Sequence, residues 1–283
     1  MKPFLGIDLT IDKKNEQLNG NEFLIQEPSF ALSNHLETSM KNADETIANS
    51  KLPFPLRIIK HLCGIMALLI IISILRADVT IAEAYQNAPG LFWVAPICAI
   101  IWLLLFISSY FKSKTVLETD ESTQIFSHLD SISNEIYTEL SVPFDAKEVD
   151  ILLFFYKEKN GNIKVTTRGM QITEYFNPVF KIFTDNEHLY LANLDGKYAF
   201  PLSSIVKMHT IKKRIRIEEW HKEEQCTKGI YKPYKLTTDN YGCVICKYYH
   251  ILEINHQGNS WGIYIPCYEL PIFEEIININ MNY

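Results

Sequence analysis

The chain has 283 residues, of which 47% are hydrophobic, and its formal net charge is −6. This length suits a membrane anchor plus one domain, because domains commonly have about 100 to 200 residues. The acidic balance removes any general electrostatic reason to expect a nucleic-acid partner, so none is predicted. The six cysteines are dispersed, unlike those of a small secreted disulfide protein, which indicates reduced thiols.

The first 55 residues are polar and lack sustained hydrophobic periodicity. The stretch from Ser33 to Ala48 has a helix-forming composition, but its apolar stripe is thin. We therefore predict a flexible cytoplasmic N-terminal arm over residues 1–55, with one short helix that docks on the C-terminal domain. The first residues resemble neither a secretory signal nor a transit peptide.

Two apolar runs follow the arm, and each is long enough to cross a membrane. The second, LFWVAPICAIIWLLLFISSYF over 91–111, has no charged side chain, whereas the first, over about 58–76, carries Lys60 and Arg76 near its ends. A bilayer core about 30 Å thick needs roughly 20 apolar residues of helix. We predict a two-helix transmembrane hairpin over residues 56–112. A buried helix of a soluble protein is the alternative for each run.

The basic residues predict how this hairpin is oriented. They stand before the first run and after the second, whereas the connector has only Arg76, at its edge. The flanking cations are Lys51, Arg57, Lys60, Lys112 and Lys114. The positive-inside rule therefore places both termini of a two-span cell-membrane protein in the cytoplasm. The interior of each span lacks acidic residues and arginine, which argues against a transporter.

Residues 113–148 are predicted to form an amphipathic helix and a connector. Apolar side chains recur there at intervals of three and four residues, as on one face of a helix. These residues are Ile125, Phe126, Leu129, Ile132, Ile136 and Leu140. Thr119 or Asp120 is the expected N-cap.

From Val149 onward the sequence changes to short aromatic and β-branched runs separated by turn residues. Asn160–Gly161, Asp195–Gly196 and Gln257–Asn259 supply the positive φ angles of tight hairpin turns. We expect about seven antiparallel strands and then a closing helix. Residues 149–283 are thus predicted to form an α+β domain, a β barrel or sandwich with a flanking amphipathic helix and a C-terminal helix over one open end.

Two stretches of this domain resemble a known family. IFTDNEHLYLANLDGKYAFPLSSIVKMHTIKKRI is similar to the hairpin, proline, short turn and strand of bacterial pleckstrin-homology-like (PH-like) domains. WGIYIPCYELPIFEEIIN resembles their last strand, proline and terminal helix. Together with the membrane hairpin, this order of parts resembles the bacterial YcxB-like membrane proteins. The resemblance implies a binding or scaffolding module without catalytic activity or cofactor, and it supplies no functional residues.

The most charged predicted strand is KMHTIKKRIRIEEW. Alternation along a strand places Lys212, Arg214 and Arg216 on one face, with the interleaved isoleucines towards the core. Cations held near an anionic leaflet gain about 1 kcal/mol each. We therefore predict that these three residues contact anionic lipid headgroups. A solvated strand whose charges discourage edge pairing is the alternative.

A zinc site is the other candidate considered for this domain, because Cys243 and Cys246 form a CxxC pair. Further ligand types nearby are Cys226, His221, His250 and Cys267. The pair lies in a run of β character, however, where residues three apart point to opposite faces. Buried thiols are therefore favoured and no metal is predicted. The chain also lacks the GxSxG, P-loop and HExxH motifs.

These patterns predict an integral membrane protein that displays a cytoplasmic PH-like binding or scaffolding domain. The expected partners are the lipid bilayer and either anionic headgroups or another membrane protein. One alternative is a membrane-anchored enzyme with residues 218–242 as an active-site lid. Another is an accessory subunit of a larger membrane complex.

Overall fold

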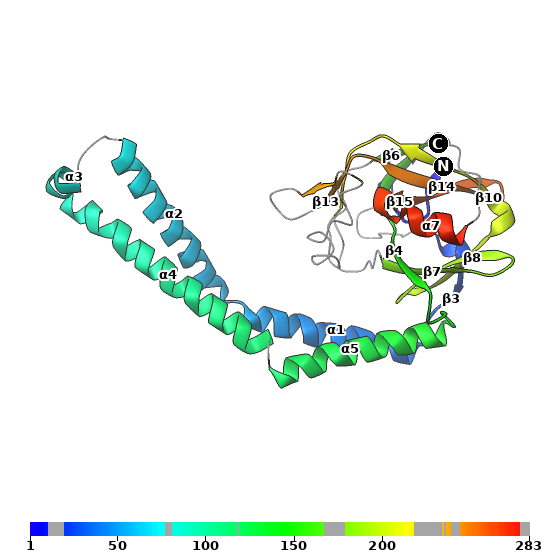
Figure 1. The fold of residues 1–283 in the computed structure, drawn as a ribbon, viewed down its shortest axis with the longest axis horizontal. Coiled ribbons are helices and arrows are strands. Elements are labelled where there is room, and N and C mark those ends of the chain that lie inside the picture. Colours follow the sequence, from blue (N-terminus) through cyan, green and yellow to red (C-terminus); the bar gives the residue numbers. More distant parts are fainter. Residues whose placement is uncertain are drawn as a thin grey trace. The chain divides into compact units, whose positions relative to one another are not determined.

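The computed structural model of the chain is drawn in Figure 1. It describes residues 1–10, 20–76, 81–117, 119–166, 179–217, 234, 236–238 and 244–277. The chain divides into two compact units. A helical unit covers Asn34–Ser133, and a β-rich unit combines Met1–Ser33 with Asn134–Tyr283. The β-rich unit therefore takes chain from both sides of the apolar runs.

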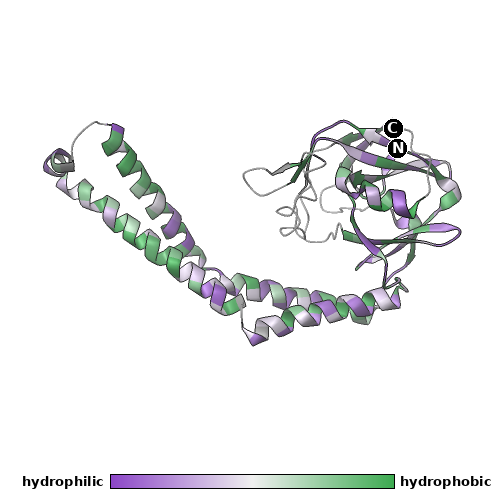
Figure 2. Cartoon of the chain, in the orientation of Figure 1, coloured by the Kyte–Doolittle hydropathy of each residue, from purple (hydrophilic) through white to green (hydrophobic). Residues whose placement is uncertain are grey.

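Two long apolar helices form a hairpin in the helical unit (Figure 1). They are α2 (Phe54–Arg76) and α4 (Pro89–Leu117), and they pack against each other. Only 11% of the most apolar stretch of α2 and 6% of that of α4 is buried. Figure 2 shows hydrophobic residues along most of both helices. Because soluble proteins rarely expose apolar surface on this scale, length and composition make both helices candidate membrane spans.

The ends of the two apolar helices differ from the ranges predicted for the spans. α2 begins at Phe54, and Pro55 lies in its first turn, where a missing N–H costs no helical hydrogen bond. The connector holds a further short helix, α3 (Ile81–Asn87). At the opposite end of the hairpin, Lys112 Nζ donates a 3.0 Å hydrogen bond to Lys51 O. This bond ties the last turns of α4 to the chain that precedes α2.

A glycine permits the close contact between α2 and α4. A Cβ atom at Gly64 would lie 2.8 Å from Trp102 Cδ1, so the indole occupies the space that a side chain would need. Gly64→Val is expected to force the helices apart and to destabilise the hairpin by about 1–3 kcal/mol, as at other overpacked sites. Gly90→Val is the matched control, because a Cβ there meets nothing within 4 Å. Thermal unfolding in detergent measures both variants, and equal Tm values would contradict the contact.

The predicted amphipathic helix after the second span is confirmed. It is α5 (Asp120–Glu139), and the buried residues on its stripe and directly after it are Ile132, Ile136 and Leu140. Thr119 is its cap, because Thr119 Oγ1 accepts a 3.3 Å hydrogen bond from Ser122 N. Before the first span, α1 extends over Phe30–Ser50, far longer than the short helix expected there.

The first ten residues differ most from the predicted flexible arm over 1–55. β1 (Lys2–Pro3) pairs in parallel with β15 (Asn259–Pro266), and β2 (Gly6–Asp8) pairs in parallel with β5 (Phe154–Lys159). Phe4, between β1 and β2, is 0% exposed. Strands of two and three residues are too short to show alternation in the sequence. Pairing with distant strands, not local pattern, orders this segment.

Two larger sheets enclose one hydrophobic core in the β-rich unit. The first has the order β3 (Leu24–Gln26), β9 (Gly196–Pro201), β8 (His188–Asn193), β7 (Val179–Thr184) and β4 (Lys147–Asp150). The second has the order β1, β15, β14 (Tyr249–His256) and β10 (Ile205–Ile211). All described sheets are open, and no barrel closes among the described strands. The structure thus has open, mostly antiparallel sheets together with helices.

Two small sheets raise the number of strands above the predicted seven or so. One is β2, β5 and β6 (Asn162–Thr166), and the other is β11 (Ile215–Ile217), β13 (Val244–Cys246) and β12 (Thr237–Thr238). The second of these sheets lies at the edges of the 218–242 insertion, most of which is outside the described residues. The strands of these sheets are short and are separated by polar residues, so the sequence does not show them as separate apolar runs.

Hairpins form at all three predicted turns, and two of the turns have the predicted positive φ angles. Asn160 and Gly161 have φ of 53° and 74°, and Gln257 and Gly258 have φ of 48° and 77°. Asp195–Gly196 differs, because Gly196 begins β9 without a positive φ. Its small size matters for another reason, since a Cβ there would lie 2.6 Å from Leu24 Cδ1 on β3.

The closing helix is confirmed at the predicted place. β15 ends at Pro266, a short 3₁₀ turn η4 (Cys267–Glu269) follows, and α7 extends over Leu270–Ile276. Phe273 on α7 is fully buried in the core. This side chain anchors α7 on the core that the two larger sheets share.

The last turn of α5 is held on the first of the larger sheets. Lys197 Nζ on β9 donates a 2.8 Å hydrogen bond to Leu140 O, just past the helix end, where a cation complements the helix dipole. Lys181 Nζ on β7 lies 5.7 Å from the centre of the Tyr137 ring. Burial, with smaller contributions from Glu148 and Asp195, raises the pKa of Tyr137 to about 12. The helix end is therefore a fixed part of the β-rich unit.

Candidate functional site

The predicted row of cations lies where two pairs of strands meet. β10 ends at Ile211 and β11 begins at Ile215, so the residues between them, Lys212–Arg214, belong to neither strand. Lys213 N donates a 2.9 Å hydrogen bond to Ile211 O, and this tight turn interrupts the strand. The single continuous strand predicted from the sequence is therefore broken, although Ile215 is buried as expected.

Strand register brings a fourth cation to this point. The paired residues on either side are Ile211 with Tyr249 and Ile215 with Cys246. Lys247 lies between those partners, in the bend that joins β13 to β14, across from Lys212–Arg214. All four side chains are exposed. We call Lys212, Lys213, Arg214 and Lys247 the cation cluster.

The members of the cation cluster lack the acidic partners that two other lysines of the β-rich unit have. Lys181 Nζ lies 2.8 Å from Glu148 Oε1, and Lys207 Nζ lies 3.7 Å from Glu253 Oε2. Within the described part of the chain, no member of the cation cluster forms an ion pair. Exposed cations without partners attract anions, and their fields add. The arrangement is therefore suited to an anionic surface or group.

A partly buried side-chain hydrogen bond joins the two strands next to the cation cluster. Thr210 Oγ1 and His250 Nδ1 lie 3.0 Å apart on neighbouring strands. Burial lowers the pKa of His250, and Glu274 partly opposes this shift. The imidazole is therefore neutral at pH 7 and adds no charge to the cluster. Its role here is to join β10 to β14.

The structure describes the side chains of two of the three residues predicted to contact lipid. The structure brings Lys212 and Arg214 together in the cation cluster. Arg216 lies in β11 opposite Ile245, and its side chain is outside the described part of the chain. Sequence reasoning missed Lys213, which alternation assigned to the other face. It also missed Lys247, because only the register of distant strands brings this residue close.

The residues considered for zinc are not assembled in the described part of the chain. Cys246 lies in the strand β13, as its β character indicated, while Cys243, Cys226 and His221 lie outside the described residues. His250 Nδ1 is engaged with Thr210. Among described residues, no group of three His, Cys, Asp or Glu side chains is arranged to hold a metal ion.

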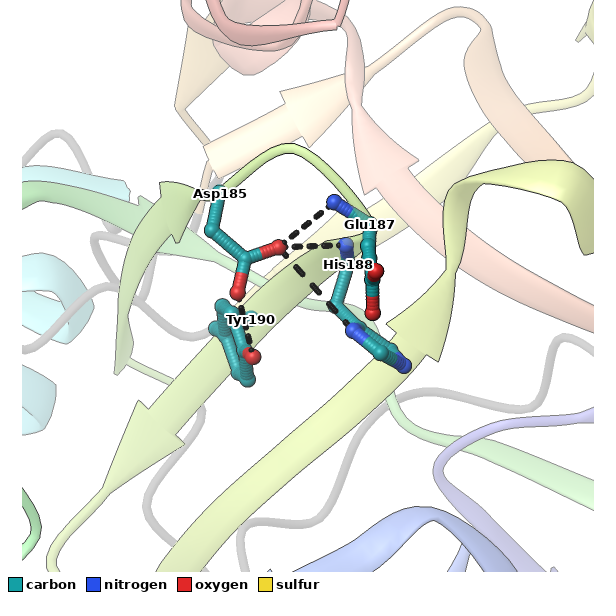
Figure 3. A network of polar contacts seen from close by, with 4 residues as sticks. All are labelled: Asp185, Glu187, His188 and Tyr190. Atoms are coloured by element: carbon teal, nitrogen blue, oxygen red, sulfur yellow. Dashed lines mark hydrogen bonds and ion pairs between the residues drawn. The ribbon is translucent and has the colours of Figure 1, made fainter.

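A polar network surrounds Asp185 in the turn between β7 and β8 (Figure 3). Asp185 Oδ1 accepts 2.7 Å hydrogen bonds from Glu187 N and His188 N, and the Tyr190 hydroxyl donates to Oδ2 at 2.7 Å. These donors, led by Glu187 N–H, lower the pKa of Asp185. Every partner is within five residues of Asp185, and the carboxylate is exposed. The network therefore stabilises the turn and gives no argument for catalysis.

Comparisons of the chain with protein-family models, curated proteins and solved structures found no match. Two features of the chain itself bear on its function. The β-rich unit is built from both flanks of the hairpin, and the cation cluster is exposed.

Proposed function

We propose that this chain is a two-span membrane protein that displays one cytoplasmic binding domain built from both of its flanks. The supporting observation is strand pairing across the hairpin: β1 with β15, β2 with β5, and β3 with β9. Residues before α2 thus share sheets with residues after α4. A chain whose two flanks form one domain crosses a bilayer an even number of times, and α2 and α4 supply two crossings.

The flanking cations support a cytoplasmic position for that domain. Arg57 and Lys60 lie in the first turns of α2, and Lys112 and Lys114 lie in the last turns of α4. From these ends the chain leads through α1 and α5 to the β-rich unit. The positive-inside rule favours the cytoplasm for such ends.

The order of strands supports a PH-like fold for the domain. β4, β7, β8 and β9 follow one another as antiparallel neighbours, β10, β14 and β15 do the same, and α7 comes last. The hairpin β8–β9, Pro201 and β10 match one of the stretches that carry the resemblance to PH-like domains. β15, Pro266 and α7 match the other. The β5–β6 hairpin and strands β11–β13 are additions to this order.

Binding to anionic lipid headgroups is the function that this arrangement supports best. The domain is tethered to the membrane, and the cation cluster offers four exposed charges, each worth about 1 kcal/mol beside an anionic leaflet. An enzyme with the 218–242 insertion as a lid has no comparable support, because most of that insertion lies outside the described residues. A subunit of a larger membrane complex would use the same topology.

Cysteine labelling in intact cells tests the proposed topology. Asn21→Cys, Gln86→Cys and Lys159→Cys each replace an exposed residue, before α2, in α3 and after α4. A membrane-impermeant maleimide should label Gln86→Cys in intact cells and the other two only after permeabilisation. The unsubstituted chain controls for native cysteines. Labelling of only one flank in intact cells would overturn the shared domain, and labelling of both flanks would reverse the orientation.

A further inference from the structure

Two histidines from distant parts of the chain meet in the helical unit. His35 lies on α1 and His128 lies on α5, and their ring centres are 6.4 Å apart. The two helices lie side by side at this point (Figure 1). Both side chains are exposed, so solvent reaches them directly. The proposed lipid contact makes no use of either residue.

The ring nitrogens of this pair are available to a ligand. Within the residues that the structure describes, hydrogen bonds and ion pairs of imidazoles are formed by His188 and His250, not by His35 or His128. The residues one helical turn away from His35 on α1, and from His128 on α5, are all uncharged. Neither imidazole is therefore engaged by a carboxylate of its own helix.

We propose that His35 and His128 bind one Zn²⁺ ion and so clamp α1 to α5. Imidazole is a common ligand of zinc. A zinc–nitrogen bond is about 2.0–2.1 Å long, so two imidazoles that share one ion have ring centres roughly 5–6.5 Å apart. The observed 6.4 Å lies in this range. The ring planes cross at 62°, so the ring edges must turn towards a common point, and exposure leaves room for that rotation.

The site has two protein ligands, so water must complete the coordination of the ion. It thus differs from a site of three or more protein ligands, and the described residues provide no such group. An ion held in this way exchanges with solvent and is removed by a chelator. The clamp therefore depends on the concentration of zinc.

The packing of α1 gives such a clamp a physical role. The buried residues of α1 are all small: Ser39, Ala43 and Ser50. Small side chains bury little apolar area, so they hold the helix weakly. Hydrogen bonds tie the chain just before α1 to α5 and the chain just after it to α4. An ion that binds only the paired helices stabilises their contact between those two ties.

Footprinting of the full chain in detergent with diethyl pyrocarbonate, which acylates free imidazoles, tests this inference. The protein is stripped with EDTA, modified at increasing Zn²⁺ concentrations and digested for mass spectrometry. Modification of His35 and His128 should fall together, with one midpoint, and by roughly 10-fold when zinc is at about ten times its dissociation constant. His61, an exposed histidine on α2, is the internal reference and should keep its reactivity.

The variant His35→Ala distinguishes one shared ion from two independent ones. Zinc should no longer protect His128 in this variant, because a single exposed imidazole holds the ion weakly. Hydrogen exchange supplies a second readout. Zinc should slow exchange of the α1 backbone amides by roughly 10-fold in the unsubstituted chain and leave it unchanged in His35→Ala. The substitution is at an exposed position, where replacements rarely disturb folding.

Two outcomes would overturn the zinc clamp. One is full reactivity of both histidines at millimolar zinc in the unsubstituted chain, which needs no variant to fold. The other is equal protection of His128 with and without His35, which would mean that each imidazole binds zinc separately. Both readouts concern the helical unit, so neither result bears on liposome binding by the β-rich unit.

Discussion

A fragment of residues 134–283 is expected to remain unfolded when it is produced alone, although it contains the strands from β4 to β15 and the C-terminal helix. It lacks β1, β2 and β3, and with them the buried rings of Phe4 and Phe23. The Phe4 ring centre lies 6.1 Å from that of Phe180 and 5.0 Å from that of Phe200. Truncating one buried Phe typically lowers the free energy of unfolding by about 3–5 kcal/mol, and the whole free energy of unfolding of a domain is about 5–15 kcal/mol. Loss of both rings together with three strands therefore removes most of the stability.

The matched chain joins residues 1–33 to 134–283 through a short Gly/Ser linker and omits the helical unit. It restores the missing strands, and the ends to be joined are near each other, because Ser29 N lies 2.8 Å from Glu139 Oε1. We expect this joined chain to be monodisperse by size-exclusion chromatography and to unfold cooperatively on heating. Cooperative unfolding of the 134–283 fragment at the same temperature would show that the N-terminal strands are dispensable.

The elements that the sequence predicted well are those whose information is local. α5 is visible because its stripe repeats every three to four residues, and the Asn160–Gly161 turn is visible because its φ angles demand those residue types. The two candidate spans are visible because crossing a bilayer would require both the length and the apolar composition of α2 and α4. For each of these elements, the residues that cause it to form lie together in one short stretch of sequence.

The elements that sequence reasoning missed depend on distant partners. β1 has two residues, and only pairing with β15 makes it a strand. Gly196 is small because Leu24 packs against it, a reason that no window around Gly196 contains. Lys247 joins the cation cluster through register alone. The candidate site was therefore predictable only in part. The sequence showed a group of cations at Lys212–Arg216, but strand pairing decides which cations lie together.

Replacing three members of the cation cluster by alanine, Lys212, Lys213 and Arg214, is expected to weaken liposome binding of the joined chain by roughly 100-fold. Three charges at about 1 kcal/mol each near an anionic leaflet account for this loss. Co-sedimentation with vesicles containing anionic phosphatidylglycerol measures it, and vesicles of phosphatidylcholine alone should pellet little protein. Binding should also fall as salt rises, because the Debye length shortens from about 10 Å at 0.1 M to about 3 Å at 1 M.

A second triple variant separates a localised site from the effect of net charge. Three exposed lysines lie on the β5–β6 hairpin: Lys157, Lys159 and Lys164. Changing them to alanine removes the same charge as the first triple variant. Their loss should weaken binding only a few-fold, whereas Lys247→Ala alone should cost roughly 5-fold, because it removes about 1 kcal/mol from the cluster itself. Equal losses from both triple variants would mean that vesicles respond to overall charge. No loss from the first triple variant would remove the cation cluster as a lipid site and would favour a protein partner for the β-rich unit.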